Sequence, residues 1–266
     1  MPWVEVGGTD IHYVEEGEGQ PIVFLHGMSS CGEAWFQQFE AFRDRFRVIA
    51  YDSVNHGHSS NSPVDEREPD RADELEGFLA ALNLRRPIIA GNSMGAMTLL
   101  RWATRHPADA LALIPSGMGV RAGAAATDAE AQRVRRMGDP LPDDVLSPPI
   151  GDSFTQEFRD TQPRMFERYM RLRATATRLE ALRRPRRGSA VDPARDELAD
   201  RVKIIESPML IVCGEIDRAR PAAETLHELV PGSRYELIAG APHNVYYEAV
   251  GPYNAVVEDF LAGVTG

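Results

Sequence analysis

Cysteine and lysine are scarce in this sequence. Its 266 residues include two cysteines and a single lysine, Lys203. Cys31 and Cys213 are too few to form a disulfide framework, and they are far from the close spacing of metal-binding pairs. We therefore expect two reduced thiols, no metal centre and no cofactor.

Positive charge is in the minority. The sequence has 29 Arg and Lys residues against 40 Asp and Glu residues, which gives a formal net charge of -11. Nucleic acids and anionic membranes bind proteins through a basic face, because such a face releases counterions from phosphates. The charge balance therefore argues against both as partners and favours a small-molecule substrate.

Long hydrophobic runs are absent as well. No run approaches the roughly 18 apolar residues that a membrane span needs. The first residues also lack the basic and then apolar segments of a secretory leader. We expect a cytoplasmic protein without a membrane partner, and the sequence leaves its oligomeric state open.

What the sequence does contain is an alternation of strand and helix patterns. A hairpin pattern covers residues 4–14, and apolar runs typical of strands occupy residues 21–25, 47–51, 87–90, 110–114, 209–213 and 235–238. Between them, apolar side chains recur every three or four positions, as in a helix expected from Trp35 to Phe46. The alternation predicts an α/β fold with a mostly parallel, eight-stranded sheet flanked by helices.

Residues 118–207 interrupt this alternation. They show helical patterns, as at residues 126–137 and 154–182, but no convincing strand. A chain of this length can bury one sizeable core. We therefore expect a core formed by residues 1–117 and 208–266, with residues 118–207 inserted as a helical cap.

The pentapeptide GNSMG at residues 91–95 is the main chemical motif. Glycines two residues before and after Ser93 allow a tight turn that exposes the serine. A G-x-S-x-G string arises by chance in roughly one chain in ten of this length. Its position between a strand pattern and a helix pattern therefore carries the prediction that Ser93 is a nucleophile.

A serine hydroxyl needs a general base, and His243 is the predicted one. It lies in a turn after the last expected strand, at the same edge of the sheet as Ser93. Asp217 follows the preceding strand and falls between the two in the chain, which gives the order serine, acid, histidine. It is predicted to orient the imidazole, with Glu215 and Asp52 as competing acids.

The oxyanion of an acyl-transfer reaction needs two backbone N–H donors. Met94, the residue after the predicted nucleophile, is the first candidate donor. Met28, in the loop after the strand at residues 21–25, is the second.

The remaining histidines have simpler expected roles. His26 is expected to support its loop by hydrogen bonding, and His56 and His58 are expected to be structural or exposed. A metal site at the last two would need a third ligand that the sequence does not identify. Three others are expected at the surface: His12, His106 and His227.

Together, these motifs resemble the α/β-hydrolase superfamily over nearly the whole chain except the cap. The matching segments are HGM at residues 26–28, DSVNHGHS at residues 52–59, the GNSMG elbow, Asp217 and His243. The family loop commonly reads D-x-R-G-H-G-x-S, whereas Val54 and Asn55 stand here in place of the arginine and glycine. The resemblance implies the α/β-hydrolase fold with a Ser-His-Asp triad.

The resemblance also narrows the chemistry. Ser93 excludes the dehalogenase and epoxide-hydrolase branches, which use aspartate at that position. The GNSMG elbow is similar to that of meta-cleavage-product hydrolases, which cut carbon–carbon bonds, but those enzymes typically carry tryptophan where this chain has Asn244. We therefore expect cleavage of a carboxylic ester, thioester or lactone through an acyl-enzyme, ahead of carbon–carbon hydrolysis. A slow-turnover ligand receptor that retains the triad is a third interpretation.

Four residues are candidates for a substrate pocket. Met97, Met118 and Met165 have flexible side chains that suit an apolar site, although core packing explains them equally well. Arg168, in the expected cap, would either clamp a substrate carboxylate or face solvent on its helix.

Overall fold

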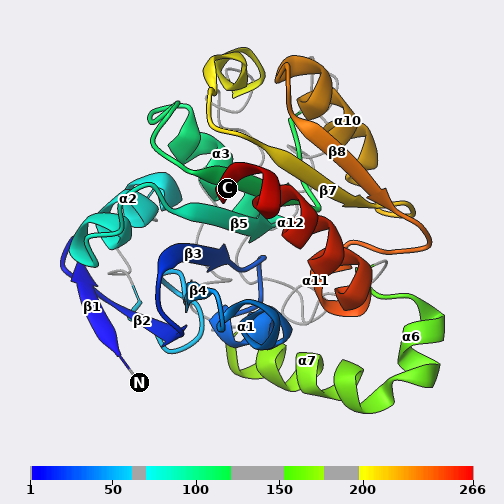
Figure 1. The fold of residues 1–266 in the computed structure, drawn as a ribbon. Helices are drawn as coiled ribbons and strands as arrows, with labels where there is room; N and C mark the ends of the chain where they lie inside the picture. The colour runs from blue at the N-terminus through cyan, green and yellow to red at the C-terminus, as the bar shows by residue number, and fades with distance from the viewer. Residues whose placement is uncertain (1, 62–69, 121–152, 177–197, 266) are drawn as a thin grey trace, which may run out of the picture.

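The computed structural model describes residues 2–61, 70–120, 153–176 and 198–265 (Figure 1). Eight strands form one sheet in the order β1-β2-β4-β3-β5-β6-β7-β8. The strands are β1 Trp3–Val6, β2 Thr9–Glu16, β3 Gln20–Leu25, β4 Phe46–Tyr51, β5 Ile88–Asn92, β6 Ala112–Ser116, β7 Leu210–Gly214 and β8 Arg234–Ile238. The predicted fold class, with its mostly parallel eight-stranded sheet, is confirmed.

The sheet begins with an antiparallel hairpin and continues with parallel strands. β2 pairs in antiparallel orientation with both β1 and β4, whereas every pair from β4 to β8 is parallel. The hairpin turn uses Gly7 and Gly8, whose φ values are 58 and 81. Residues with a Cβ rarely adopt positive φ values of this kind. The carboxyl ends of β3 to β8 therefore all lie at one edge of the sheet.

Helices cover both faces of the sheet (Figure 1). α2 (Arg71–Ala81), α3 (Met94–Ala103) and α10 (Arg220–Leu229) contribute to the core on one face. α1 (Phe36–Phe42) and α12 (Val250–Thr265) contribute to the core on the other face. The architecture is thus three layers, with the sheet in the middle.

The alternation of side chains along each strand builds the two cores. In β3, Val23 and Leu25 belong to the cluster beneath α2 and α3, whereas Ile22 and Phe24 belong to the cluster beneath α12. All four side chains are buried. A strand covered on both faces needs apolar residues at every position, which is why these strands read as continuous apolar runs.

Two element boundaries differ from the sequence prediction. The apolar spacing places Phe46 on a helix, but α1 has already ended and Phe46 begins β4. Its side chain enters the same core as α1, which explains the misleading spacing. The strand expected at residues 110–114 lies at Ala112–Ser116 instead, because β6 extends to the end of β5, where Ser116 pairs with Asn92.

The described part of the predicted cap is helical. α6 (Gln156–Thr161) and α7 (Pro163–Ala176) lie where the sequence predicts helix interrupted at Pro163, and a short 3-10 helix, η3, spans Val202–Ile204. Proline suits the first turn of α7, because its missing N–H has no helical acceptor there. Much of residues 118–207 lies outside the described ranges, so the inserted cap and its boundaries stay a prediction.

Aromatic contacts attach α7 to the core. The ring centroids of Tyr169 and Tyr247 lie 4.9 Å apart, and the Tyr247 hydroxyl donates to the carbonyl of Met165 at 2.9 Å. Tyr247 belongs to the short helix α11 (Val245–Glu248). The described part of α7 is therefore held beside the segment that precedes α12.

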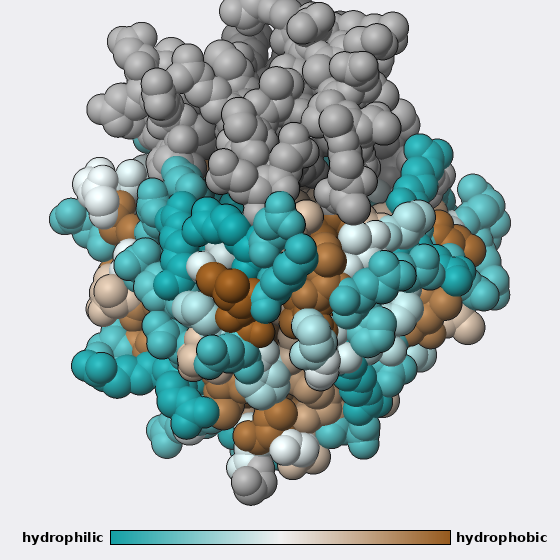
Figure 2. All heavy atoms as spheres, turned by 90° about the horizontal axis from the view of Figure 1, so that it is seen from above, coloured by the Kyte–Doolittle hydropathy of each residue, from teal (hydrophilic) through white to brown (hydrophobic). Residues whose placement is uncertain are grey.

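Polar residues dominate the face seen in Figure 2. Its described part is mostly teal, and brown hydrophobic side chains show only in small areas between polar ones. The large hydrophobic side chains that are exposed in the described ranges are Trp3, Met28, Ile204, Ile216 and Leu237. Within the same ranges, none of the helices combines the length and the apolar character needed to cross a membrane.

Candidate active site

Ser93 occupies the turn between β5 and α3. Its backbone torsions are φ 54 and ψ -108, a conformation that costs a residue with a Cβ about 1–3 kcal/mol. Its N–H donates to the carbonyl of Ser116 at 2.9 Å, and its carbonyl accepts the N–H of Met97 at 3.0 Å. These bonds hold the strained strand-to-helix turn that is typical of a nucleophile elbow.

The two glycines of the GNSMG motif are required by close packing. A Cβ at Gly91 would lie 2.5 Å from the carbonyl carbon of Gly95, and a Cβ at Gly95 would lie 2.2 Å from the carbonyl oxygen of Leu25. Both distances are far inside van der Waals contact. The start of α3 therefore approaches the ends of β3 and β5 only because both positions lack a side chain.

His243 and Asp217 are hydrogen-bonded to each other where β8 and β7 end. Nδ1 of His243 lies 3.0 Å from Oδ2 and 3.1 Å from Oδ1 of Asp217. Because a carboxylate only accepts, Nδ1 carries the hydrogen, and Nε2 is left as the basic nitrogen. Asp217 is 5% exposed and also accepts the N–H of Ala219 at 2.9 Å, so its carboxylate is held in place.

The two competing acids have other partners. Glu215 is exposed and accepts the N–H of Gly240 at 2.8 Å. Asp52 is paired with His12 at 2.9 Å. Of these three carboxylates, Asp217 is the one that the structure brings to His243.

Gly117, directly after β6, allows His243 to approach the elbow. It has φ 60, and a Cβ there would lie 2.7 Å from Oδ1 of Asn92 and 3.2 Å from Cε1 of His243. The imidazole therefore lies next to the residue that precedes Ser93. A Cβ at Gly27, after β3, would likewise lie 3.5 Å from the Cβ of Ser93. The loops after β3, β5, β6 and β8 thus meet around the serine.

A buried amide pair joins the elbow to the histidine loop. Nδ2 of Asn92 donates to Oδ1 of Asn244, and Oγ of Ser116 donates to Oδ1 of Asn92, both at 3.3 Å. Asn92 and Asn244 are 1% and 4% exposed. One precedes Ser93 and the other follows His243 in the chain, but local sequence patterns do not show that they touch. Sequence reasoning therefore missed this contact.

Tyr169 of α7 lies beside the same amide pair. Burial raises the pKa of its phenol, and the neighbouring polar side chains of Ser30 and Asn244 offset part of that rise. The described part of the predicted cap therefore contacts the loop that carries His243.

The two predicted oxyanion donors lie at this edge of the sheet. Met94 is the first residue of α3, where backbone N–H groups have no acceptor within the helix and the helix dipole favours an anion. Met28 follows Gly27 and is 40% exposed. Both backbone amides thus belong to segments that surround Ser93.

The loop after β4 departs from the family motif, and α2 supplies the missing contacts. The N–H of Val54 donates to Glu74 at 3.1 Å, and the carbonyl of Val54 accepts from Arg71 at 3.4 Å. Asn55, at the family's glycine position, has φ 68, a region in which asparagine is enriched among residues with a Cβ. Two residues of α2 therefore bind the backbone of the loop at the position where the family motif has arginine.

His26 supports the loop that carries Met28, as its position predicts. Its Nδ1 donates to the carbonyl of Gly27 at 2.8 Å, and its Nε2 accepts the N–H of Ser53 at 3.0 Å. Burial lowers the pKa of His26 to about 4, so its ring is neutral near neutral pH. Burial also lowers the pKa of His56, whose ring centroid lies 5.0 Å from that of His26.

The expectation that His12 lies at the surface is wrong. The side chain is 2% exposed and is hydrogen-bonded to Asp52, 40 positions further along the chain. A partner so distant in sequence leaves no local signal. His106 and His227 are less deeply placed, and they pair with Asp109 and Ser233.

The four predicted pocket residues have separate environments. Met97 packs against the core beneath α3, and Met165 packs against the core beneath α12. Met118 is half-buried after β6. Arg168 is exposed, and its guanidinium lies 3.5 Å from the centroid of the Phe36 ring. Their part in a substrate pocket stays a prediction.

Neither cysteine competes with Ser93 as a nucleophile. Cys31 and Cys213 are free and buried, and burial raises the pKa of each thiol to about 12. A thiol with such a pKa is protonated near neutral pH and is a poor nucleophile.

The sequence matches the model of a protein family described as the alpha/beta hydrolase fold over residues 20–250. The chain therefore belongs to the alpha/beta hydrolase fold family, and it is a hydrolase. The family that the sequence motifs indicate is confirmed.

Three known proteins illustrate this likeness. The chain is 26% identical to 2-hydroxy-6-oxononadienedioate/2-hydroxy-6-oxononatrienedioate hydrolase 2 of Pseudomonas putida, over 94% of this chain and 91% of that protein. It is 38% identical over 86 residues to (E)-2-((N-methylformamido)methylene)succinate hydrolase of Acinetobacter baylyi, a match that covers 32% of this chain and 33% of that relative. It shares the fold of the enol-lactonase from Burkholderia xenovorans LB400, with a TM-score of 0.83, 23% identity and coverage of 98% of this chain and 100% of that chain.

Proposed function

We propose that this hydrolase uses Ser93 as its nucleophile, His243 as its general base and Asp217 to orient the histidine. The observation that carries the proposal is the hydrogen bond between Asp217 and Nδ1 of His243, at 3.0 Å. It leaves Nε2 able to accept a proton. The strained turn at Ser93 adds support, because such strain is found at functional sites.

In the proposed reaction, Nε2 of His243 takes the hydroxyl proton as Oγ of Ser93 attacks the carbonyl carbon of the substrate. The tetrahedral intermediate carries an oxyanion, which the amides of Met28 and Met94 would hold. Its collapse breaks the bond to the leaving oxygen or sulfur, and His243 returns the proton to that atom. Water then attacks the acyl-enzyme by the same route and releases the acid.

A carboxylic ester, thioester or lactone is the substrate class that we favour. Meta-cleavage-product hydrolases typically carry tryptophan after the catalytic histidine, whereas this chain has Asn244 at that position. Here the Asn244 amide is buried and bonded to Asn92, so the position serves a polar contact inside the protein.

Carbon–carbon hydrolysis is the second candidate. It is favoured by the likeness of the GNSMG elbow to the meta-cleavage-product hydrolases, and by the alignment of 94% of the chain with the dienedioate hydrolase of Pseudomonas putida. Both candidates use the same serine and histidine, so the substrate decides between them.

The proposed cap, residues 118–207, would cover the serine and select the substrate. Support comes from Tyr169 of α7, which is buried against Ser30 and the loop that carries His243. We further propose a small-molecule substrate that enters between this cap and the edge of the sheet.

The test is a panel of nitrophenyl esters, thioesters, lactones and a 2-hydroxy-6-oxo-dienoate, each assayed with the wild type and with Ser93→Ala as the blank. We expect the esters or lactones to be hydrolysed and the variant to show no activity above background. Faster turnover of the dienoate would establish the second candidate. Undiminished hydrolysis by Ser93→Ala would contradict both.

A further inference from the structure

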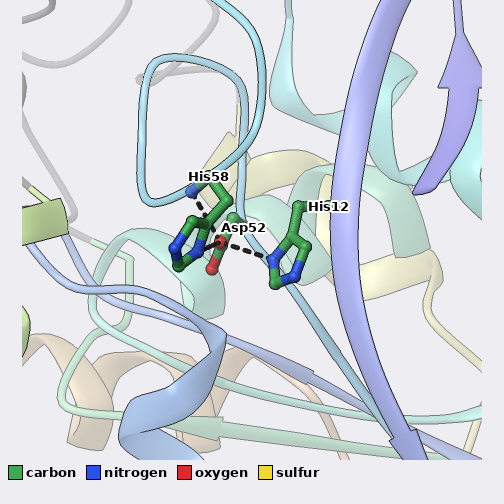
Figure 3. Close-up of side chains that lie close together, drawn as sticks. All are labelled: His12, Asp52 and His58. Carbon is green, nitrogen blue, oxygen red and sulfur yellow. Dashed lines mark hydrogen bonds and ion pairs between the residues drawn. The ribbon is translucent and has the colours of Figure 1, made fainter. Parts of the chain in front are cut away.

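We propose that His12, Asp52 and His58 form a binding site for a divalent transition metal of the zinc class (Figure 3). The sequence predicts no metal centre, because it offers His56 and His58 without a third ligand. The structure supplies a different set, in which His12 reaches the loop after β4 from β2. The proposal is independent of the proposed hydrolysis.

The three side chains converge on one point. Figure 3 shows the carboxylate of Asp52 between the two imidazole rings. Oδ2 of Asp52 lies 2.9 Å from Nδ1 of His12 and 3.5 Å from Nδ1 of His58. The two ring centroids are 4.7 Å apart, and one ligand atom from each residue lies within 4.8 Å of the others.

These distances suit a four-coordinate metal. Zinc binds imidazole nitrogen and carboxylate oxygen at about 2.0–2.2 Å, and tetrahedral angles then put neighbouring ligand atoms about 3.3–3.5 Å apart. The observed separation of 3.5 Å between Oδ2 of Asp52 and Nδ1 of His58 lies within that range, and the separation of 2.9 Å between Oδ2 and Nδ1 of His12 is shorter than it. Two imidazoles and one carboxylate also form a donor set that favours the binding of zinc over that of magnesium or calcium.

The site has both a buried side and an open side. The side chains of His12 and Asp52 are 2% and 3% exposed, whereas that of His58 is 55% exposed. A metal ion would therefore enter past His58, and water would complete its coordination there. Three protein ligands with an open fourth position are a common zinc arrangement.

Surrounding hydrogen bonds hold two of the ligands before any metal binds. Oδ1 of Asp52 accepts the N–H of Gly32 at 2.7 Å, and Oδ2, which faces the two rings, also accepts the backbone N–H of His58 at 2.9 Å. Oγ of Ser59 accepts the N–H of His12 at 2.8 Å and donates to the carbonyl of Asp52. Partners of this kind orient metal ligands and strengthen binding.

The protons balance without a further reactant. In the metal-free arrangement, Nδ1 of His12 donates its hydrogen to Asp52. On binding, Nδ1 gives its lone pair to the metal, and the hydrogen moves to Nε2, which has no hydrogen-bond partner among the described residues. His58 binds as a neutral imidazole through its own Nδ1.

A bound ion would link β2 directly to the loop after β4 and, through Asp52, to the loop that carries Met28. Asp52 and His58 belong to the loop after β4, and Oδ1 of Asp52 holds Gly32, at the end of the loop that carries Met28. An ion that binds the folded chain but not the unfolded chain raises stability by mass action. The expected effect is therefore a rise in thermal stability.

The test compares the EDTA-treated full chain with and without zinc chloride, with magnesium chloride as a second probe. We expect calorimetric titration to show one zinc per chain, and we expect zinc at about 100 times its dissociation constant to raise the Tm by about 5 °C. Magnesium at the same concentration should leave the Tm unchanged. Cobalt(II) should give the strong visible absorption of a four-coordinate site.

Two histidine variants make the test specific. His58→Ala removes an exposed ligand and should weaken zinc binding at least tenfold, with His58→Gln as the substitute if that variant does not fold. His106→Ala is the matched control, because His106 also has two acidic neighbours, Asp109 and Glu76, but they lie at opposite ring nitrogens. It should bind zinc as the wild type does. No saturable zinc binding, a Tm rise that His58→Ala retains, or a weak six-coordinate cobalt spectrum would overturn the proposal.

Discussion

Asn92 donates an amide hydrogen bond to Asn244 across 3.3 Å, and so connects the residue before Ser93 with the residue after His243. The serine follows β5 and the histidine follows β8, which are separated in the sheet by β6 and β7. The amide pair therefore joins two parts of the proposed site that the sheet keeps apart. Both side chains are buried, so neither bonds to solvent instead.

We expect this pair to act as a unit in catalysis. Asn92→Ala and Asn244→Ala should each lower kcat by about tenfold, because each loosens the placement of serine against histidine. The double variant should lose little more than the larger single loss, since either single change already removes the hydrogen bond between the two amides. Steady-state kinetics of the four proteins measure this coupling. Losses that multiply would show that the two residues act separately.

Gly117 is expected to tolerate no side chain. Its φ is 60, which is unfavourable for a residue with a Cβ. An added Cβ would also lie 2.7 Å from Oδ1 of Asn92 and 3.2 Å from Cε1 of His243. Gly117→Ala should therefore displace the histidine and lower kcat/KM by at least about 100-fold. Gly232→Ala is the matched control, because Gly232 has φ 87 but nothing within 4 Å of its would-be Cβ. It should lose about 1 kcal/mol of stability and keep its activity; equal activity losses in both variants would contradict the account.

Asp217 and Glu215 provide a second matched pair. Asp217→Asn would keep the shape of the side chain but offer an amide where Nδ1 of His243 now donates, which favours the wrong tautomer. We expect kcat to fall by about 10³–10⁴-fold. Glu215→Gln should stay within about twofold of the wild type, because Glu215 bonds Gly240 instead. The reverse ranking in an ester assay would identify Glu215 as the acid.

Acid should destabilise the protein through His26. Its pKa is about 4 in the folded protein and about 6.5 in an unfolded chain, so the unfolded chain binds the proton first as pH falls. The free energy of unfolding is then unaffected above about pH 6.5 and loses about 3 kcal/mol between pH 6.5 and 4 through this residue. Urea unfolding at pH 7, 5.5 and 4 should show a smaller loss for His26→Gln, and an unchanged loss would count against the assignment.

The sheet could be predicted from the sequence because burial on both faces leaves a strong signal. Continuous apolar runs mark β3 and β5, and the observed strands agree with them to within two residues. The Ser93 elbow could be predicted for a related reason. Its glycines are set by local torsions and close packing, which a short motif records.

Contacts between distant segments could not be predicted in the same way. The sequence places His12 at the surface and gives it no partner, whereas the fold buries it against Asp52. The Asn92 and Asn244 amides, 152 positions apart, likewise reveal their contact only in three dimensions. The sequence leaves Arg168 as either a carboxylate clamp or a solvent-facing residue, and its place over the Phe36 ring depends on how α7 meets α1.

Labelling with a fluorophosphonate tests the central claim most directly. Such a reagent forms a covalent bond only with a serine that a neighbouring base activates. Intact mass spectrometry should show one label per chain, peptide mapping should place it on Ser93, and Ser93→Ala and His243→Ala should each abolish it. A wild-type protein that stays unlabelled while it hydrolyses esters, or a label on another serine, would contradict the assignment of Ser93 as the nucleophile.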